Sequence, residues 1–155
     1  MNVLTKSVRT LAVVLAVSGV WMCAAQGQSY KPSLGDIMGA TQLRHFKLWF
    51  AGKLANWPLA AYELEQIRAS FSDAMRLYPN IPVADLSIMG PAAQKLDQAI
   101  KAEDSAKFAR AFGEMTDACN SCHQSIGRGF IKIQIPAASP FSNQSFEPSA
   151  KGSHD

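Results

Sequence analysis

The sequence has no apolar run long enough to span a membrane and no strong charge excess of either sign. Its most apolar stretch, residues 11–22, is shorter than the roughly 20 residues needed to span a bilayer. The 155 residues hold 15 basic and 12 acidic side chains, without a long basic run or an internal repeat. This balance gives no reason to expect nucleic acid or a membrane as partner. We expect one soluble domain without stable membrane association.

Residues 1–27 have the layout of a secretory signal peptide. Lys6 and Arg9 precede the apolar run, and small residues follow it. Cleavage after Ala25 and cleavage after Gly27 fit about equally well. Without this segment, 13 basic side chains stand against 12 acidic ones, so the pI of 8.8 belongs mostly to residues that are removed. The sequence therefore predicts an exported, periplasmic protein.

Cysteine is scarce, with three residues in the chain. Cys23 lies in the signal segment, where lipid attachment is the minor alternative because the bulky Trp21 and Met22 precede it. Removal of the signal leaves an even pair, Cys119 and Cys122.

Helical periodicity recurs in four segments joined by short connections. The expected helices cover residues 34–54, 58–77, about 91–102, and a fourth that begins at Asp104 or Ser105 and stops at Gly127. An irregular turn is expected over residues 84–90. The fold class is therefore all-α, an up-and-down four-helix bundle in a domain of residues 28–127. Residues 128–155 are expected to form an extended arm with a disordered end.

Residues 119–123 read Cys-Asn-Ser-Cys-His. Two thiols at this spacing can each form a thioether with a haem vinyl group, and the adjacent imidazole can bind the iron. The three side chains share one side of the expected helix, on its buried stripe. We predict one covalent haem c per chain, held by Cys119 and Cys122, with His123 as an iron ligand.

The same residue types also occur in other sites, namely a structural disulfide, a redox-active dithiol and a zinc site. A thioredoxin-like dithiol needs a preceding strand, which the helical pattern lacks. Zinc needs a fourth ligand, and only His45 is well placed. Motif and export together favour haem.

The second axial position decides between electron transfer and gas binding. His45 is the leading candidate because it lies on the apolar stripe of the first expected helix. Met38, seven residues earlier on that stripe, is the second candidate. The alternative is that His45 is an ordinary core histidine hydrogen-bonded to a neighbour.

Basic and aromatic side chains complete the candidate site. Arg128, one turn after His123, is the best partner for a haem propionate, ahead of Arg44 and Lys47. The aromatic residues 46, 49, 50 and 57 could pack on the porphyrin, but filling of the bundle core is favoured.

The chain resembles the class II c-type cytochromes, the cytochrome c′ family, over about residues 34–127. Three features carry this resemblance: the Cys-x-x-Cys-His motif near the end of a fourth helix, the sequence Gln42-Leu43-Arg44 in the first helix, and the four amphipathic helices themselves. The resemblance implies that the two cysteines of the motif hold haem and that His123 is the proximal ligand. The strings Leu-Trp-Phe-Ala-Gly at 48–52 and Ser-Pro-Phe-Ser-Asn-Gln at 139–144 look like those of small exported cytochrome c family proteins. The arm after residue 127 and the histidine at position 45 depart from cytochrome c′ and argue against its gas-binding behaviour.

The sequence thus predicts a monohaem electron carrier that is not an enzyme. Its expected partners are periplasmic redox proteins, and homodimerisation through the first two helices stays open. The alternative is a haem protein that binds NO or CO at an open distal face. A peroxidase-like site is disfavoured because Arg44 and His45, as helical neighbours, point about 100° apart.

Overall fold

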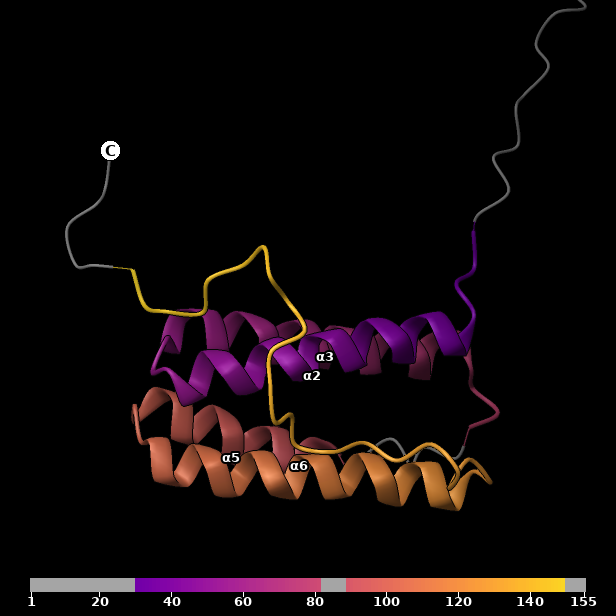
Figure 1. The fold of residues 1–155 in the computed structure, drawn as a ribbon. Helices are drawn as coiled ribbons and strands as arrows, with labels where there is room; N and C mark the ends of the chain where they lie inside the picture. Colours follow the sequence, from indigo (N-terminus) through magenta and orange to yellow (C-terminus); the bar gives the residue numbers. More distant parts are fainter. Residues whose placement is uncertain (1–29, 82–88, 150–155) are drawn as a thin grey trace, which may run out of the picture. The chain divides into compact units, whose positions relative to one another are not determined.

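The computed structural model describes residues 30–81 and 89–149. Within them the helices are α2 (Leu34–Lys53), α3 (Trp57–Leu77), α5 (Met89–Lys101) and α6 (Ser105–Ser125), and no strand occurs. Figure 1 shows α2 and α3 in one layer and α5 and α6 in the other. Each helix packs on the next, and α6 also meets α2. The prediction of an all-α, up-and-down four-helix bundle is confirmed.

Local sequence signals set the helix ends. Ser33 caps α2 in a capping box with Asp36, and Asp104 caps α6. Gly127, with a φ of 71°, adopts the left-handed conformation that ends α6. The expected turn at 84–90 is wrong at its end, because Met89 and Gly90 already belong to α5. Residues 84–88 lie outside the described part of the chain.

Aromatic residues fill one end of the bundle. The ring centroid of Phe108 lies 6.3 Å from that of Trp49 and 6.0 Å from that of Trp57. A Cβ atom added to Gly52 would lie 2.1 Å from Phe108 Cζ, so glycine lets this ring lie against α2. Trp49 of α2 and Trp57 at the start of α3 therefore help to fill the core, as favoured.

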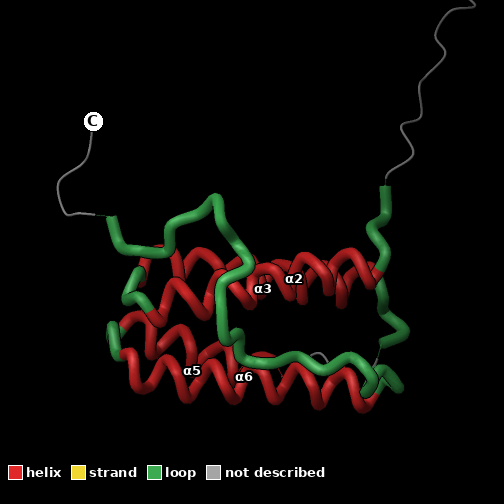
Figure 2. The backbone as a smooth tube through the Cα atoms, viewed as in Figure 1, coloured by secondary structure: helices red, strands yellow, loops and turns green. Residues whose placement is uncertain are grey.

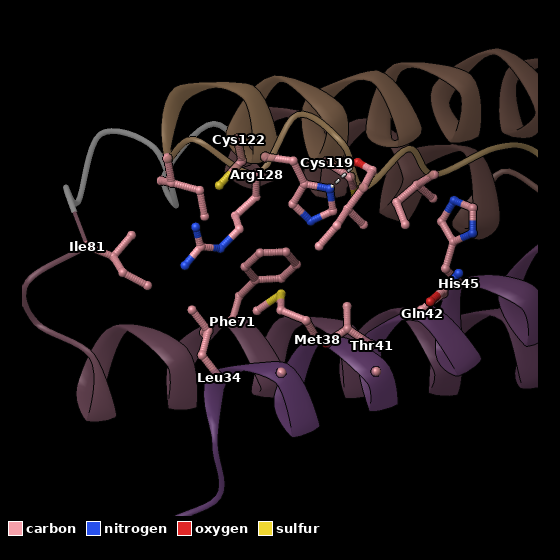
Figure 3. A pocket seen from close by; sticks show the side chains of 16 residues that line it. Leu34, Met38, Thr41, Gln42, His45, Phe71, Ile81, Cys119, Cys122 and Arg128 are labelled. Atoms are coloured by element: carbon pink, nitrogen blue, oxygen red, sulfur yellow. Dashed lines mark hydrogen bonds between the residues drawn. The ribbon is translucent and has the colours of Figure 1, made fainter.

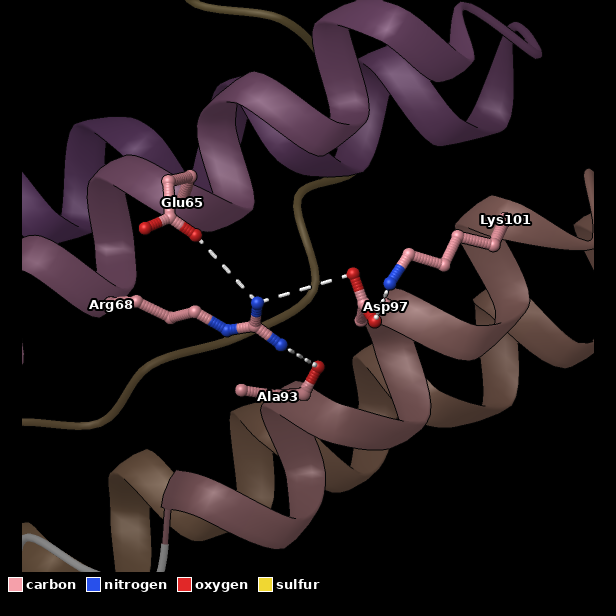
Figure 4. A network of polar contacts seen from close by, with 5 residues as sticks. All are labelled: Glu65, Arg68, Ala93, Asp97 and Lys101. Carbon is pink, nitrogen blue, oxygen red and sulfur yellow. Dashed lines mark hydrogen bonds and ion pairs between the residues drawn. The ribbon is translucent and has the colours of Figure 1, made fainter.

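Polar contacts tie α3 to α5 at the surface (Figure 4). The Arg68 guanidinium donates a hydrogen bond to the Ala93 carbonyl at 3.1 Å and lies 3.6 Å from the Glu65 carboxylate and 3.9 Å from that of Asp97. Lys101 approaches the same Asp97 carboxylate at 2.7 Å. Such half-exposed ion pairs orient the two helices and contribute little stability each.

The described part of the C-terminal arm, residues 128–149, is extended as predicted and contains no helix or strand. Figure 2 shows it returning along α6 and then crossing to the layer of α2. Its far part is anchored by Phe146, which is 6% exposed and packs on Phe50. The Asn56 amide donates to the carbonyl oxygens of residues 146 and 147. The sequence did not predict this attachment, and residues 150–155, the expected disordered end, are outside the described range.

No helix within residues 30–81 and 89–149 combines the length and apolar character that crossing a membrane requires. The expected signal peptide, residues 1–27, lies outside the described residues.

Candidate functional site

A pocket of about 400 Å³ opens at the end of the bundle opposite the aromatic end. Its volume lies in the usual range for cofactor sites. It brings together the residues that the sequence analysis favoured for haem attachment, iron ligation and propionate pairing: Met38, His45, Cys119, Cys122, His123 and Arg128. The remaining lining is mostly apolar and comes from α2, α3 and the arm (Figure 3).

The two cysteines lie on the α6 side of this pocket. Cys122 is buried and Cys119 half-buried, and neither is in a disulfide. Burial, and secondarily Cys122, raise the pKa of Cys119 to about 12. A redox-active dithiol instead requires a lowered pKa, so this environment disfavours the dithiol alternative. Within residues 30–81 and 89–149, no three His, Cys, Asp or Glu side chains cluster as a metal-ion site would require.

His123 is held by the arm. Its Nδ1 lies 3.0 Å from the Ile131 carbonyl oxygen. Because a carbonyl oxygen only accepts, Nδ1 carries the proton in this pair, and in the neutral ring Nε2 then keeps its lone pair. Histidines that bind metals are commonly fixed in this way, with the second ring nitrogen donating to a carbonyl.

His45 is buried, with 3% exposure, and Thr116 holds it in place. The Thr116 hydroxyl donates to the Phe112 carbonyl at 2.9 Å and therefore accepts from His45 Nε2, also at 2.9 Å. The imidazole packs on the Phe112 ring, with a centroid distance of 4.4 Å. Burial lowers the pKa of His45 to about 4, so the ring is neutral at pH 7. These contacts are those of a satisfied core histidine that also borders the pocket.

The register of α2 and α6 places Met38, and not His45, opposite His123. The helices run antiparallel, since His45 meets Thr116 while Gly52, farther along α2, meets Phe108, farther back on α6. His123 lies seven residues after Thr116, and Met38 lies seven residues before His45. Seven residues of helix advance about 10 Å. Figure 3 shows Met38 with Phe71 in the middle of the pocket and His45 at one end.

The three basic residues considered as partners of a haem propionate differ in whether they line the pocket. The Arg44 guanidinium pairs with the buried Glu63 carboxylate at 3.1 Å, and the Lys47 ammonium lies 5.1 Å from the centre of the Phe141 ring. Neither lines the pocket. Arg128 does, and Figure 3 shows its guanidinium directed into it. The lining contains no carboxylate, so Arg128 could pair with an acidic group of a bound ligand.

Sequence reasoning missed several residues of the site. Phe71 supplies the α3 wall, and Ile131 and Ile133 supply the arm wall. The alternation of isoleucine and polar residues from position 131 onward was an available signal, since period two places alternate side chains on one face. No sequence signal paired Thr116 with His45, because that contact depends on the register of two helices far apart in the chain.

The family model of cytochrome c′ matches residues 83–125, which include α5 and α6 with the thiols and His123. The prediction of a class II, cytochrome c′-like protein is confirmed by this match. The match indicates a haem-binding c-type cytochrome. No curated protein and no solved structure matches the chain. The site fits haem c, because two thiols, an imidazole with an available Nε2, apolar walls and one guanidinium converge on a single pocket.

Proposed function

We propose that this protein is a periplasmic monohaem c-type cytochrome that carries single electrons between periplasmic redox proteins. The supporting observation is the convergence of Cys119, Cys122 and His123 on one apolar pocket, with His123 Nδ1 engaged and Nε2 available. The thiols would hold haem c covalently, and His123 would be an axial ligand. When bound, haem supplies one-electron redox chemistry. The proposal assigns no catalytic step to the chain.

The chain's own residues provide three further conditions for electron transfer. The mostly apolar walls would limit the contact of a bound haem with water, which tunes its potential. Arg128 places a positive charge at the pocket and would compensate the propionate groups of a bound haem. His45 remains neutral on Thr116 and so adds no charge to the interior.

For the second axial ligand we favour Met38, which reverses the ranking from the sequence. Its level along α2 matches that of His123 on α6, and a thioether opposite histidine is an established ligand pair of electron-transfer haems. His45 lies about 10 Å farther along the helix axis. It would also have to give up its Thr116 hydrogen bond to bind through Nε2.

A gas-binding haem protein is the second candidate function. The observation in its favour is the apolar wall formed by Leu34, Phe71 and Ile81, which offers an uncharged space for a diatomic ligand. If Met38 only borders this space without ligation, the distal face is open to CO or NO.

Absorption spectra of protein made with the haem-attachment machinery test the proposal. We expect covalent haem, low-spin spectra in both redox states and no change on adding CO. Met38→Ala should become high-spin and bind CO, whereas His45→Ala should stay low-spin. Met75→Ala is the matched control, since this methionine lies on α3, is 41% exposed and does not line the pocket.

Each contrary outcome has a definite meaning. Wild-type protein without covalent haem would overturn the proposal. A high-spin wild type that binds CO would select the gas-binding function, and a spectral change in His45→Ala alone would assign the ligand to His45.

A further inference from the structure

The side chain of Asn120, the first variable residue of the Cys-x-x-Cys-His motif, binds the backbone of the arm. Its amide Nδ2 donates to the Ile133 carbonyl at 2.9 Å, and the Ile133 N–H donates to Asn120 Oδ1 at 2.8 Å. One side chain thus satisfies both backbone groups of a residue 13 positions away. This two-bond clasp fixes the position of the arm against α6.

The clasp lies close to the carbonyl that holds His123. Ile131, two residues before Ile133, accepts the His123 Nδ1 hydrogen bond. On its other side, the Ile131 N–H donates to the Arg128 carbonyl at 2.8 Å, and the Arg128 N–H donates to the His123 carbonyl at 2.6 Å. The Ile131 carbonyl is therefore held between a turn that begins at the end of α6 and the Asn120 clasp.

We propose that Asn120 is a positioning residue for the iron ligand, acting through the arm by holding the Ile131 carbonyl where His123 Nδ1 donates to it. This inference rests on the proposed function. A hydrogen bond from the second ring nitrogen fixes the imidazole orientation and raises its basicity as a ligand. A more basic ligand stabilises ferric over ferrous iron and lowers the midpoint potential.

The role of Asn120 is distinct from general attachment of the arm. The arm has a second anchor, where Phe146 packs on Phe50 and the Asn56 amide binds the backbone. The other variable residue of the motif, Ser121, donates a hydrogen bond to the Asp117 carbonyl of its own helix. Of the two variable residues of the motif, Asn120 is thus the one whose side chain binds the backbone of the arm, at Ile133.

The test compares Asn120→Ala with two matched controls in the haem-loaded full-length protein. Ser121→Ala alters the other variable residue of the motif, and Phe146→Ala loosens the far anchor of the arm. The measurements are the midpoint potential and the hydrogen exchange of the Ile133 amide and of the His123 ring N–H. Exchange at Ile133 is also readable in protein that carries no haem.

We expect Asn120→Ala to speed exchange at both protons and to shift the ferric–ferrous equilibrium about tenfold toward ferrous, a rise of about 59 mV for one electron. Neither control should move the potential. Asn120→Ser, a milder change without added charge, should shift it in the same direction and serves if the alanine variant does not fold.

Faster exchange at Ile133 with an unchanged potential would overturn the proposal, because Asn120 would then only attach the arm. An equal rise in potential in Phe146→Ala would also overturn it. Failure of the proposed function gives a different result, since the wild type would carry no covalent haem while exchange at Ile133 would still report on the clasp.

Discussion

The two ends of the bundle are built from the same helix pair and differ in what fills the space between them. At one end, Gly52 brings α2 close to α6, and the rings of residues 49, 57, 108 and 112 fill the interior. At the other end, Met38 and Gly39 face the Cys119–His123 segment across a pocket of about 400 Å³. The fold is therefore closed by large aromatic side chains at one end, and it stays open at the other, where the haem motif lies.

Along the pair α2 and α6, the aromatic end therefore contributes mainly to stability, and the pocket end carries the candidate site. Phe112 is fully buried against His45, Trp49 and Phe108. Close packing of this kind makes the aromatic end sensitive to the loss or gain of a few atoms. The pocket end can accept a large planar group because its own side chains do not fill it. His45 lies at the boundary, with its ring on Phe112 and one edge in the pocket.

Truncation of a side chain at the aromatic end should cause the largest loss of stability. Phe112→Ala should lower the free energy of unfolding by about 3–5 kcal/mol, because a fully buried ring is replaced by a cavity. Phe71→Ala at the pocket end should cost less, since that ring already borders open space, and it should change the haem spectrum. Urea unfolding and visible spectra measure both effects. Equal losses of stability would contradict the division of the bundle into two ends.

His45, which lies between the two ends of the bundle, should make the stability of the fold sensitive to acid. The pKa of His45 is about 4 in the fold, against 6.5 for an ordinary histidine. Between these values the unfolded chain binds the proton more readily, so stability is complete above pH 6.5 and falls as the pH decreases toward 4. The slope contributed by one group is at most about 1.4 kcal/mol per pH unit.

Unfolding free energies at pH 7, 5.5 and 4.5 test this expectation, with His45→Phe as the variant that cannot titrate. As the pH falls, the unfolding free energy of the wild type should decrease relative to that of the variant. A difference independent of pH would contradict a folded-state pKa of His45 well below that of an ordinary histidine.

Local signals predicted most of the fold. Ser33, Asp104 and Gly127 mark helix ends through capping and turn chemistry, which depend on neighbours in sequence. The predicted start of α5 at about residue 91 is two residues late, since the helix begins at Met89 and Pro91 lies in its first turn, where proline is tolerated. The path of the arm depends on contacts of Asn120 and Phe146 with distant residues, which no local pattern reveals.

The candidate site was predictable as a set of residues but not as an arrangement. The spacing of Cys119, Cys122 and His123 is local and therefore readable from the sequence. Whether Met38 or His45 faces His123 depends on how α2 and α6 are aligned, and both residues occupy the same stripe of α2. The alignment is set by Gly52 against Phe108, a contact between residues far apart in the chain.

The smallest predicted changes in stability come from replacing two glycines of α2, one at each end of the bundle. A Cβ atom at Gly52 meets the Phe108 ring, whereas one at Gly39 meets nothing within 4 Å. Gly52→Ala should destabilise the protein by about 1–3 kcal/mol through overpacking. Gly39→Ala should stabilise it by about 0.5–1 kcal/mol, because alanine loses less backbone entropy in a helix. Thermal unfolding of the two variants measures the opposite signs, and a shift of the same sign in both would show that the ends are packed alike.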